Sequence, residues 1–242
     1  MADGLLVPKA ADGMGAFAGE DGRVILVCNH ELENGDPRHG AFADGAALPD
    51  AIAEKMYDAG DRLTPMTGGT TTIIYNPATG KSEKQFLSLA GTELNCAGGT
   101  TPWGSWLTCE ECVKDAGIRG KVHREKAHGY VFEVPASATG LAEARPIRAM
   151  GRFEHEAAAV DPNTGIVYLT EDKHHSLFYR YIPDVPGQLM QGGRLQALAI
   201  VDQPSKRTHN WSNKPDMIAG QPLPVSWIDL DDVDGDDEQL HV

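Results

Sequence analysis

Three of the four cysteines of this 242-residue chain lie in one stretch, NCAGGTTPWGSWLTCEEC, which covers residues 95–112. Thiols beside carboxylates can form a redox pair, half of a zinc site or part of another metal centre. Redox CxxC motifs open a helix, whereas Cys109 and Cys112 end an aromatic run and enclose two glutamates, whose charge raises a thiol pKa. Structural zinc needs a second soft pair, and Cys28 and Cys96 lack CxxC spacing. The first two interpretations are therefore disfavoured.

Three further clusters combine carboxylates with His or Cys next to strand-like runs. They are CNHELENGD (residues 28–36), GRFEHEAAAVD (151–161) and TEDKHH (170–175). Successive side chains of a strand point to opposite faces, so Glu154 and Glu156 share one face and His155 takes the other. Taken one at a time, each cluster could instead be ordinary surface charge in contact with solvent. Their regular placement favours one common mouth where strand ends converge.

Short strands must position these clusters. Runs of β-branched and aromatic residues, closed by Gly, Pro, Asn or Asp, recur along the chain. The predicted strands are residues 23–29, 70–76, 84–90, 104–110, 129–135, 156–161, 166–172, 177–183, 195–201 and 225–230. Only residues 50–59, with Asp50 as the cap, have a helical pattern. The sequence therefore predicts an all-β protein.

Two similar turns, YNPATGK and VDPNTGI, start their Asx-Pro pairs at Asn76 and Asp161. Asx-Pro sets up each turn, and Gly80 and Gly165 take the positive φ that closes it. The turns are 85 positions apart, about twice the roughly 40 to 45 residues of a four-stranded propeller blade. This spacing favours a β-propeller, with a sandwich or another barrel as the alternative. Five or six such blades barely fit, so we expect residues 1–242 to form a single domain that is part of a propeller.

Composition excludes two classes of partner. A formal net charge of −14 argues against nucleic-acid binding, which draws on Lys and Arg to neutralise phosphates. The longest apolar runs, such as residues 195–201, are far shorter than the roughly 18 to 20 residues of a membrane span. The N-terminus MADGLLVPKAADG has no readable export signal, which predicts a cytoplasmic protein if the start is genuine.

The longer motifs closely resemble the PhoX-type alkaline phosphatase family. They are LAGTELNCAGGTTPWGSWLTCEE, GYVFEV, MGRFEHEAAAVDPNTGIVYLTED and SLFYRYIP, within a similarity that runs from DGMGAF and VCNHEL to WIDLDD. The resemblance implies a six-bladed β-propeller that hydrolyses phosphate monoesters with iron and calcium in its central mouth. It also implies a periplasmic or secreted location. Family members continue into further blades with an R-x-E-G segment, so we expect this chain to be an incomplete member.

The resemblance also assigns residues. It makes Cys96 the thiolate ligand of iron and Glu156 a carboxylate shared between ions. Four further glutamates are similar to positions in or next to the metal cluster: Glu31, Glu110, Glu111 and Glu171. A thiolate suits iron and carboxylates suit calcium, so this mixed set fits a mixed-metal site. Cys109 matches a family position and Cys112 does not, which favours a structural role for Cys109.

Three functions compete for these motifs. The leading hypothesis is a monomeric, metal-dependent phosphomonoesterase that acts on small phosphate esters. Arg152 and Lys173 flank the carboxylate clusters and could contact phosphate. The alternative is that both are surface charges that offset the nearby acidic residues. The second function is a non-catalytic propeller fragment that binds partners or supports structure. Thiol redox chemistry at Cys109 and Cys112 is the third.

Overall fold

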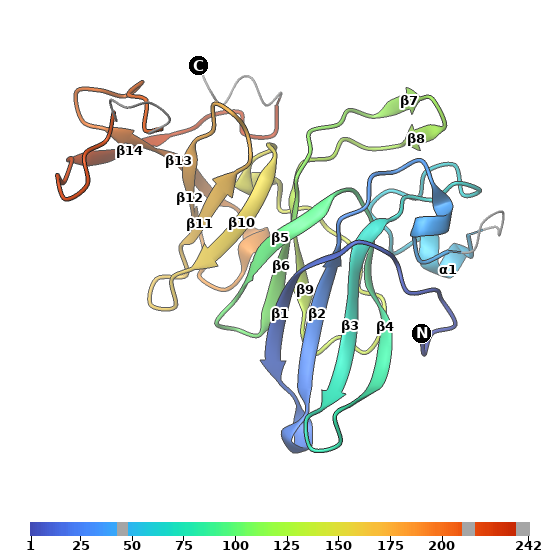
Figure 1. The fold of residues 1–242 in the computed structure, drawn as a ribbon. Coiled ribbons are helices and arrows are strands. Elements are labelled where there is room, and N and C mark those ends of the chain that lie inside the picture. The colour runs from blue at the N-terminus through green and yellow to red at the C-terminus, as the bar shows by residue number, and fades with distance from the viewer. Residues whose placement is uncertain (43–47, 210–215, 236–242) are drawn as a thin grey trace.

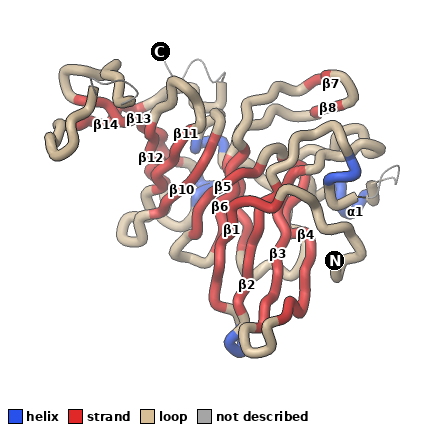
Figure 2. The backbone as a smooth tube through the Cα atoms, in the orientation of Figure 1, coloured by secondary structure: helices blue, strands red, loops and turns tan. Residues whose placement is uncertain are grey.

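The computed structural model describes residues 1–42, 48–209 and 216–235, and antiparallel strands dominate it, as the red segments of Figure 2 show. We call its three larger sheets blades 1, 2 and 3. Blade 1 contains β1 (Ala11–Ala18), β2 (Val24–His30), β3 (Gly68–Asn76) and β4 (Lys81–Thr92). Blade 2 contains β5 (Asn95–Thr100), β6 (Ser105–Glu110) and β9 (Val131–Pro135). Blade 3 contains β10 (His155–Val160), β11 (Val167–Glu171), β12 (Phe178–Pro183), β13 (Gly193–Ile200) and β14 (Val225–Asp229).

The first strand of each blade lies against that of the next blade. Figure 1 shows β5 between β1 and β10. This approach depends on glycine, because a Cβ added to Gly99 of β5 would lie 1.9 Å from the carbonyl oxygen of Ala158 in β10. A Cβ on Gly13 of β1 would likewise lie 2.8 Å from the carbonyl oxygen of Cys96. The all-β prediction is confirmed, and three neighbouring antiparallel blades fit the predicted part of a propeller.

Two apolar layers hold the blades together. Between blades 1 and 2, Val27 and Leu89 pack with Trp106 and Phe132. A larger layer joins blades 2 and 3 and includes Leu107, Val131, Leu169, Tyr179 and Tyr181, all fully buried. Burying one such aliphatic or aromatic side chain contributes roughly 1.5–3 kcal/mol, so these layers fix the relative positions of the strand ends.

Helices play a small part. The helix predicted over residues 50–59 is only α1 (Asp50–Ala53), and 3-10 turns occur at Glu20–Gly22, Pro37–His39, Arg148–Met150 and Leu189–Gln191. After α1 the backbone N–H groups of Tyr57 and Asp58 donate to Ala90 and Gly91 of β4, so pairing with a strand overrides the helical pattern. Within the described residues, no helix has the length and apolar character of a membrane span.

All ten predicted strands are present, whereas β1, β5 and the ribbon of β7 (Gly117–Arg119) and β8 (Val122–Arg124) were not predicted. The turn chemistry is confirmed, since φ is +68° at Gly80 and +73° at Gly165. The first turn joins β3 to β4 and the second joins β10 to β11. The two turns therefore occupy different places in their blades, and using their spacing to count blades was wrong.

Candidate metal centre

Cys96, Glu111 and Glu156 meet at one end of the blades. Each offers one ligand atom, and the three atoms all lie within 4.8 Å of one another. Cys96 is buried, whereas the two glutamates are partly exposed. The sequence predicted all three residues as ligands, and the structure brings them together from three strand ends in two blades. One cysteine sulfur and two carboxyl groups at this separation form a donor set for a metal ion, and burial raises the pKa of the Cys96 thiol, which must lose its proton to become a ligand.

Three more carboxylates extend this group. Glu111 is hydrogen-bonded to Asp172, and Glu31 is hydrogen-bonded to Asp12. Glu156 interacts electrostatically with both aspartates. Glu31 was predicted, whereas Asp12 and Asp172 were missed. We call these six residues the acidic cluster: Asp12, Glu31, Cys96, Glu111, Glu156 and Asp172.

The three blades contribute residues to the acidic cluster from equivalent positions of their strand pairing. The first strand of each blade pairs with the second at Ala11 with His30, Asn95 with Glu110, and His155 with Glu171. In every blade, the two residues that directly follow the paired residues, one on each strand, belong to the acidic cluster. These residues are Asp12 and Glu31 in blade 1, Cys96 and Glu111 in blade 2, and Glu156 and Asp172 in blade 3.

A β-bulge follows each of these pairs. From Ala11 to Met14, from Asn95 to Gly98 and from His155 to Ala158, three steps on the first strand correspond to two on its partner. A bulge bends its strand and re-aims a side chain. The repeated bulge therefore explains why an aspartate, a cysteine and a glutamate reach one cluster from three different strands.

Burial and nearby like charges make the glutamates of the acidic cluster hold protons more tightly. Burial, the hydrogen bond to Asp172 and the charges of Glu156 and Glu31 raise the pKa of Glu111 to about 7. Burial and the hydrogen bond to Asp12 raise the pKa of Glu31, and burial and nearby aspartates raise that of Glu156. A bound cation would remove the repulsion between these carboxylates. The donor set thus fits calcium through its oxygens and iron through the Cys96 sulfur.

The family model for alkaline phosphatase PhoX matches residues 1–241. The chain belongs to the PhoX family. A similar solved structure is described as Pseudomonas fluorescens PhoX in complex with vanadate, a transition state analogue; it has 20% sequence identity and a TM-score of 0.48. The match covers 82% of this chain and 48% of that one, so this chain spans about half the length of the solved PhoX. A search of curated proteins finds no match.

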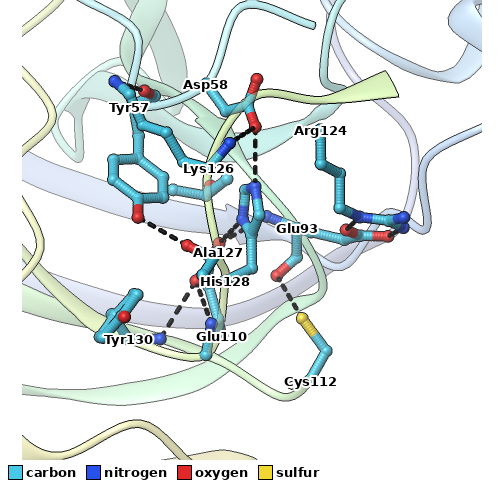
Figure 3. Close-up of polar contacts among 12 residues, drawn as sticks. Tyr57, Asp58, Glu93, Glu110, Cys112, Arg124, Lys126, Ala127, His128 and Tyr130 are labelled. Atoms are coloured by element: carbon cyan, nitrogen blue, oxygen red, sulfur yellow. Dashed lines mark hydrogen bonds and ion pairs between the residues drawn. The ribbon is translucent and has the colours of Figure 1, made fainter. Parts of the chain in front are cut away.

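Glu110 of this PhoX chain was predicted to lie in or next to the metal cluster, and the structure places it next to Glu111 with its carboxylate bonded inside the blade. It is fully buried, and its carboxylate is 2.7 Å from Nδ1 of His128 (Figure 3). The same carboxylate accepts hydrogen bonds from the backbone N–H groups of Glu93, Gly129 and Tyr130. Because successive side chains of a strand point in opposite directions, Glu110 points into the blade, whereas Glu111 points to the cluster.

Glu171, also predicted to lie in or next to the cluster, is placed in the same way. Its Oε2 accepts hydrogen bonds from the backbone N–H of Leu177 at 2.9 Å and from the hydroxyl of Tyr179 at 3.0 Å. The residue that joins the acidic cluster from this strand is its neighbour Asp172. Aligning the motifs NHE, CEE and TED by their third residue would have selected Glu31, Glu111 and Asp172 together.

The two basic candidates have different surroundings. Arg152 is buried, its Nε donates to the carbonyl oxygen of His128, and its Nη2 lies 2.7 Å from Asp115. These contacts hold Arg152 inside the blade, and its contact with phosphate stays a prediction. Lys173 follows Asp172 and is partly exposed, and its contact with phosphate stays a prediction.

The surroundings of the CxxC pair disfavour redox chemistry. All four cysteines belong to the described residues, and all are buried free thiols. Burial raises the pKa of both Cys109 and Cys112, which disfavours the reactive thiolate. A structural role for Cys109 agrees with its place in the layer between blades 2 and 3.

Proposed function

We propose that this chain provides the metal-binding mouth of a phosphomonoesterase and acts on phosphate esters of small molecules at an iron and calcium cluster. The convergence of Cys96, Glu111 and Glu156 is the observation that carries this proposal. Membership of the PhoX alkaline phosphatase family supports the substrate class. A binding role for anionic phosphate requires the excess negative charge of the mouth to be neutralised, and metal ions provide that neutralisation.

The residues of the acidic cluster would divide between two kinds of ion. The Cys96 sulfur would hold iron, and Glu156, close to both the sulfur and the other carboxylates, would be shared between ions. Glu111, Glu31 and the two aspartates offer oxygens for calcium. When bound, such ions polarise the phosphoryl oxygens of a substrate and stabilise charge on the transferred group.

Proton release accompanies binding in this proposal. Glu111 has a pKa of about 7, so near neutral pH its carboxyl group is partly protonated before a cation arrives. It must lose that proton to become a ligand. The cluster residues therefore bind metal best above neutral pH, which agrees with an alkaline working range.

The direct test is metal analysis of the purified chain after loading with iron and calcium, followed by hydrolysis of p-nitrophenyl phosphate at alkaline pH. We expect bound metal in the wild type and its loss in Cys96→Ala and Glu156→Gln. Glu143→Gln is the matched control, because Glu143 is exposed and paired only with Arg145 among the contacts described. Unchanged metal content in both cluster variants would overturn the site.

The second candidate, a non-catalytic propeller fragment that binds partners or supports structure, is kept because the chain spans about half the length of the solved PhoX. The same experiment separates the two functions. Phosphate release that depends on Cys96 and Glu156 supports the phosphomonoesterase. A well-folded chain that takes up neither iron nor calcium and releases no phosphate supports the non-catalytic fragment.

A further inference from the structure

The residue before each second-strand carboxylate of the acidic cluster is polar and buried. His30 precedes Glu31, Glu110 precedes Glu111, and Glu171 precedes Asp172; the first of each pair is between 0% and 7% exposed. We call His30, Glu110 and Glu171 the anchor residues. They occupy the same register position in the three blades, directly opposite the start of the first strand.

Every anchor residue is held by side-chain hydrogen bonds. The ring nitrogens of His30 lie 2.9 Å from the carbonyl oxygen of Lys9 and 2.9 Å from the hydroxyl of Thr71. Glu171 accepts from Leu177 and Tyr179 as described above. A buried polar group costs free energy unless it is bonded, so each anchor fixes the rotation of its strand end.

Glu110 has the most extensive contacts (Figure 3). His128 lies between Glu110 and Asp58, with Nδ1 2.7 Å from Glu110 and Nε2 3.2 Å from Asp58. Although burial lowers the pKa of His128, the two carboxylates raise it to about 9, so the ring is an imidazolium at neutral pH. Its positive charge compensates the buried carboxylate of Glu110.

The contacts of Glu110 extend to the backbone that joins blades 1 and 2. Glu110 accepts from the N–H of Glu93, whose own carboxylate forms two 2.7 Å bonds with Arg124. The following residue, Leu94, donates its N–H to Leu32 and accepts from the N–H of Glu111. One loop residue therefore connects the segment after Glu31 with Glu111 itself.

We propose that the anchor residues are positioning residues for the acidic cluster, and that Glu110 positions Glu111 and Glu31 through Glu93 and Leu94. This inference rests on the proposed function, because it says that the anchor residues hold the ligands of a metal site in place. Hydrogen-bonded groups behind metal ligands typically affect metal affinity by about 10- to 100-fold when removed. Glu110 and Glu171 act in this way without touching the ion.

The test combines calcium affinity with amide exchange. Titration calorimetry with calcium alone is expected to show about tenfold or greater loss of affinity in Glu110→Gln. Hydrogen exchange is expected to accelerate at the N–H groups of Leu94 and Glu111, which a general loss of stability would not select. Glu133→Gln is the matched control, because Glu133 is in the same blade and accepts hydrogen bonds from Trp103 and Ser105.

Wild-type affinity and exchange in a folded Glu110→Gln variant would overturn the proposal, as would equal losses in Glu133→Gln. If Glu110→Gln does not fold, Glu171→Gln decides the question through the amide of Asp172, which donates to the carbonyl oxygen of Glu154. A wild-type chain that takes up no calcium would refute the proposed function, while the exchange rates would still test the positioning role.

Discussion

The sulfur of Cys96 lies 3.5 Å from the carbonyl oxygen of Glu156, a residue 60 positions later in the chain. This proximity depends on β5 and β10 lying in contact. Gly99 maintains that contact, because its missing Cβ would overlap the carbonyl oxygen of Ala158. Strand packing and the geometry of the acidic cluster are thus coupled through one glycine.

We therefore predict that Gly99→Ala separates Cys96 from Glu156. Overpacking at this contact is expected to lower the free energy of unfolding by at least about 1–3 kcal/mol. Urea unfolding and metal content measure the two effects. Gly140→Ala is the control, because a Cβ there meets no atom within 4 Å. Normal metal content in Gly99→Ala would contradict the coupling.

The raised pKa of Glu111 predicts how the metal-free protein responds to pH. A carboxyl whose pKa is about 7 in the folded state and near 4.5 when unfolded binds its proton more tightly in the folded state. Stability of the metal-free protein should therefore fall as pH rises from about 4.5 to 7. Thermal unfolding across this range measures the slope, and Glu111→Gln should reduce it. A slope that is unchanged in Glu111→Gln would assign the effect to other groups.

Metal loading should reverse that trend. A cation requires the deprotonated carboxylate, so calcium affinity should rise with pH through neutrality. Calorimetry in two buffers of different ionisation enthalpy should show proton release near pH 7 in the wild type and less in Glu111→Gln. Identical binding heats in the two buffers would contradict a protonated Glu111.

His128 predicts a second pH window. Its pKa is about 9 in the folded protein, above the ordinary value of 6.5. The stabilisation from its ion pairs is complete below about 6.5 and is lost as pH rises through 9. His128→Gln leaves two buried carboxylates without their cation, which should cost about 3–5 kcal/mol. Chemical denaturation at pH 6 and pH 9.5 should show a smaller pH effect in the variant than in the wild type.

The strands that could be predicted from sequence are those whose packing selects β-branched and aromatic residues. The strands β1 and β5 were missed because close contact between blades selects Gly and Ala, which are rare in strands. These two strands carry Asp12 and Cys96. Cys96 was assigned as a ligand only through its family motif, and Asp12, although it begins the similar segment DGMGAF, was not assigned.

The candidate site shows a different limit. Adjacent acids such as Glu110 and Glu111 have the same chemistry, and only the pairing register says which of the two points into a blade. A shift of one position exchanges the two faces of a strand. The sequence therefore locates each carboxylate pair, but chemistry alone does not separate Glu171, an anchor residue, from Asp172, a member of the acidic cluster; only the common alignment of the three motifs does so.

The repeated register makes Asp12 a test of the whole arrangement. Asp12 occupies in blade 1 the position of Cys96 in blade 2 and Glu156 in blade 3. Asp12→Asn keeps the shape of the side chain but removes a charge that raises the pKa of Glu31. We expect the pKa of Glu31 to fall and calcium affinity to drop at least about tenfold, since ligand charge sets the affinity of such sites.

The control for Asp12→Asn is Asp21→Asn, a change of the same charge in the turn between β1 and β2, at the other end of blade 1. Calorimetry gives the affinities, and carboxyl NMR gives the titration of Glu31. If both variants bind calcium alike, blade 1 would contribute no first-strand ligand, and the acidic cluster would draw such ligands only from β5 and β10.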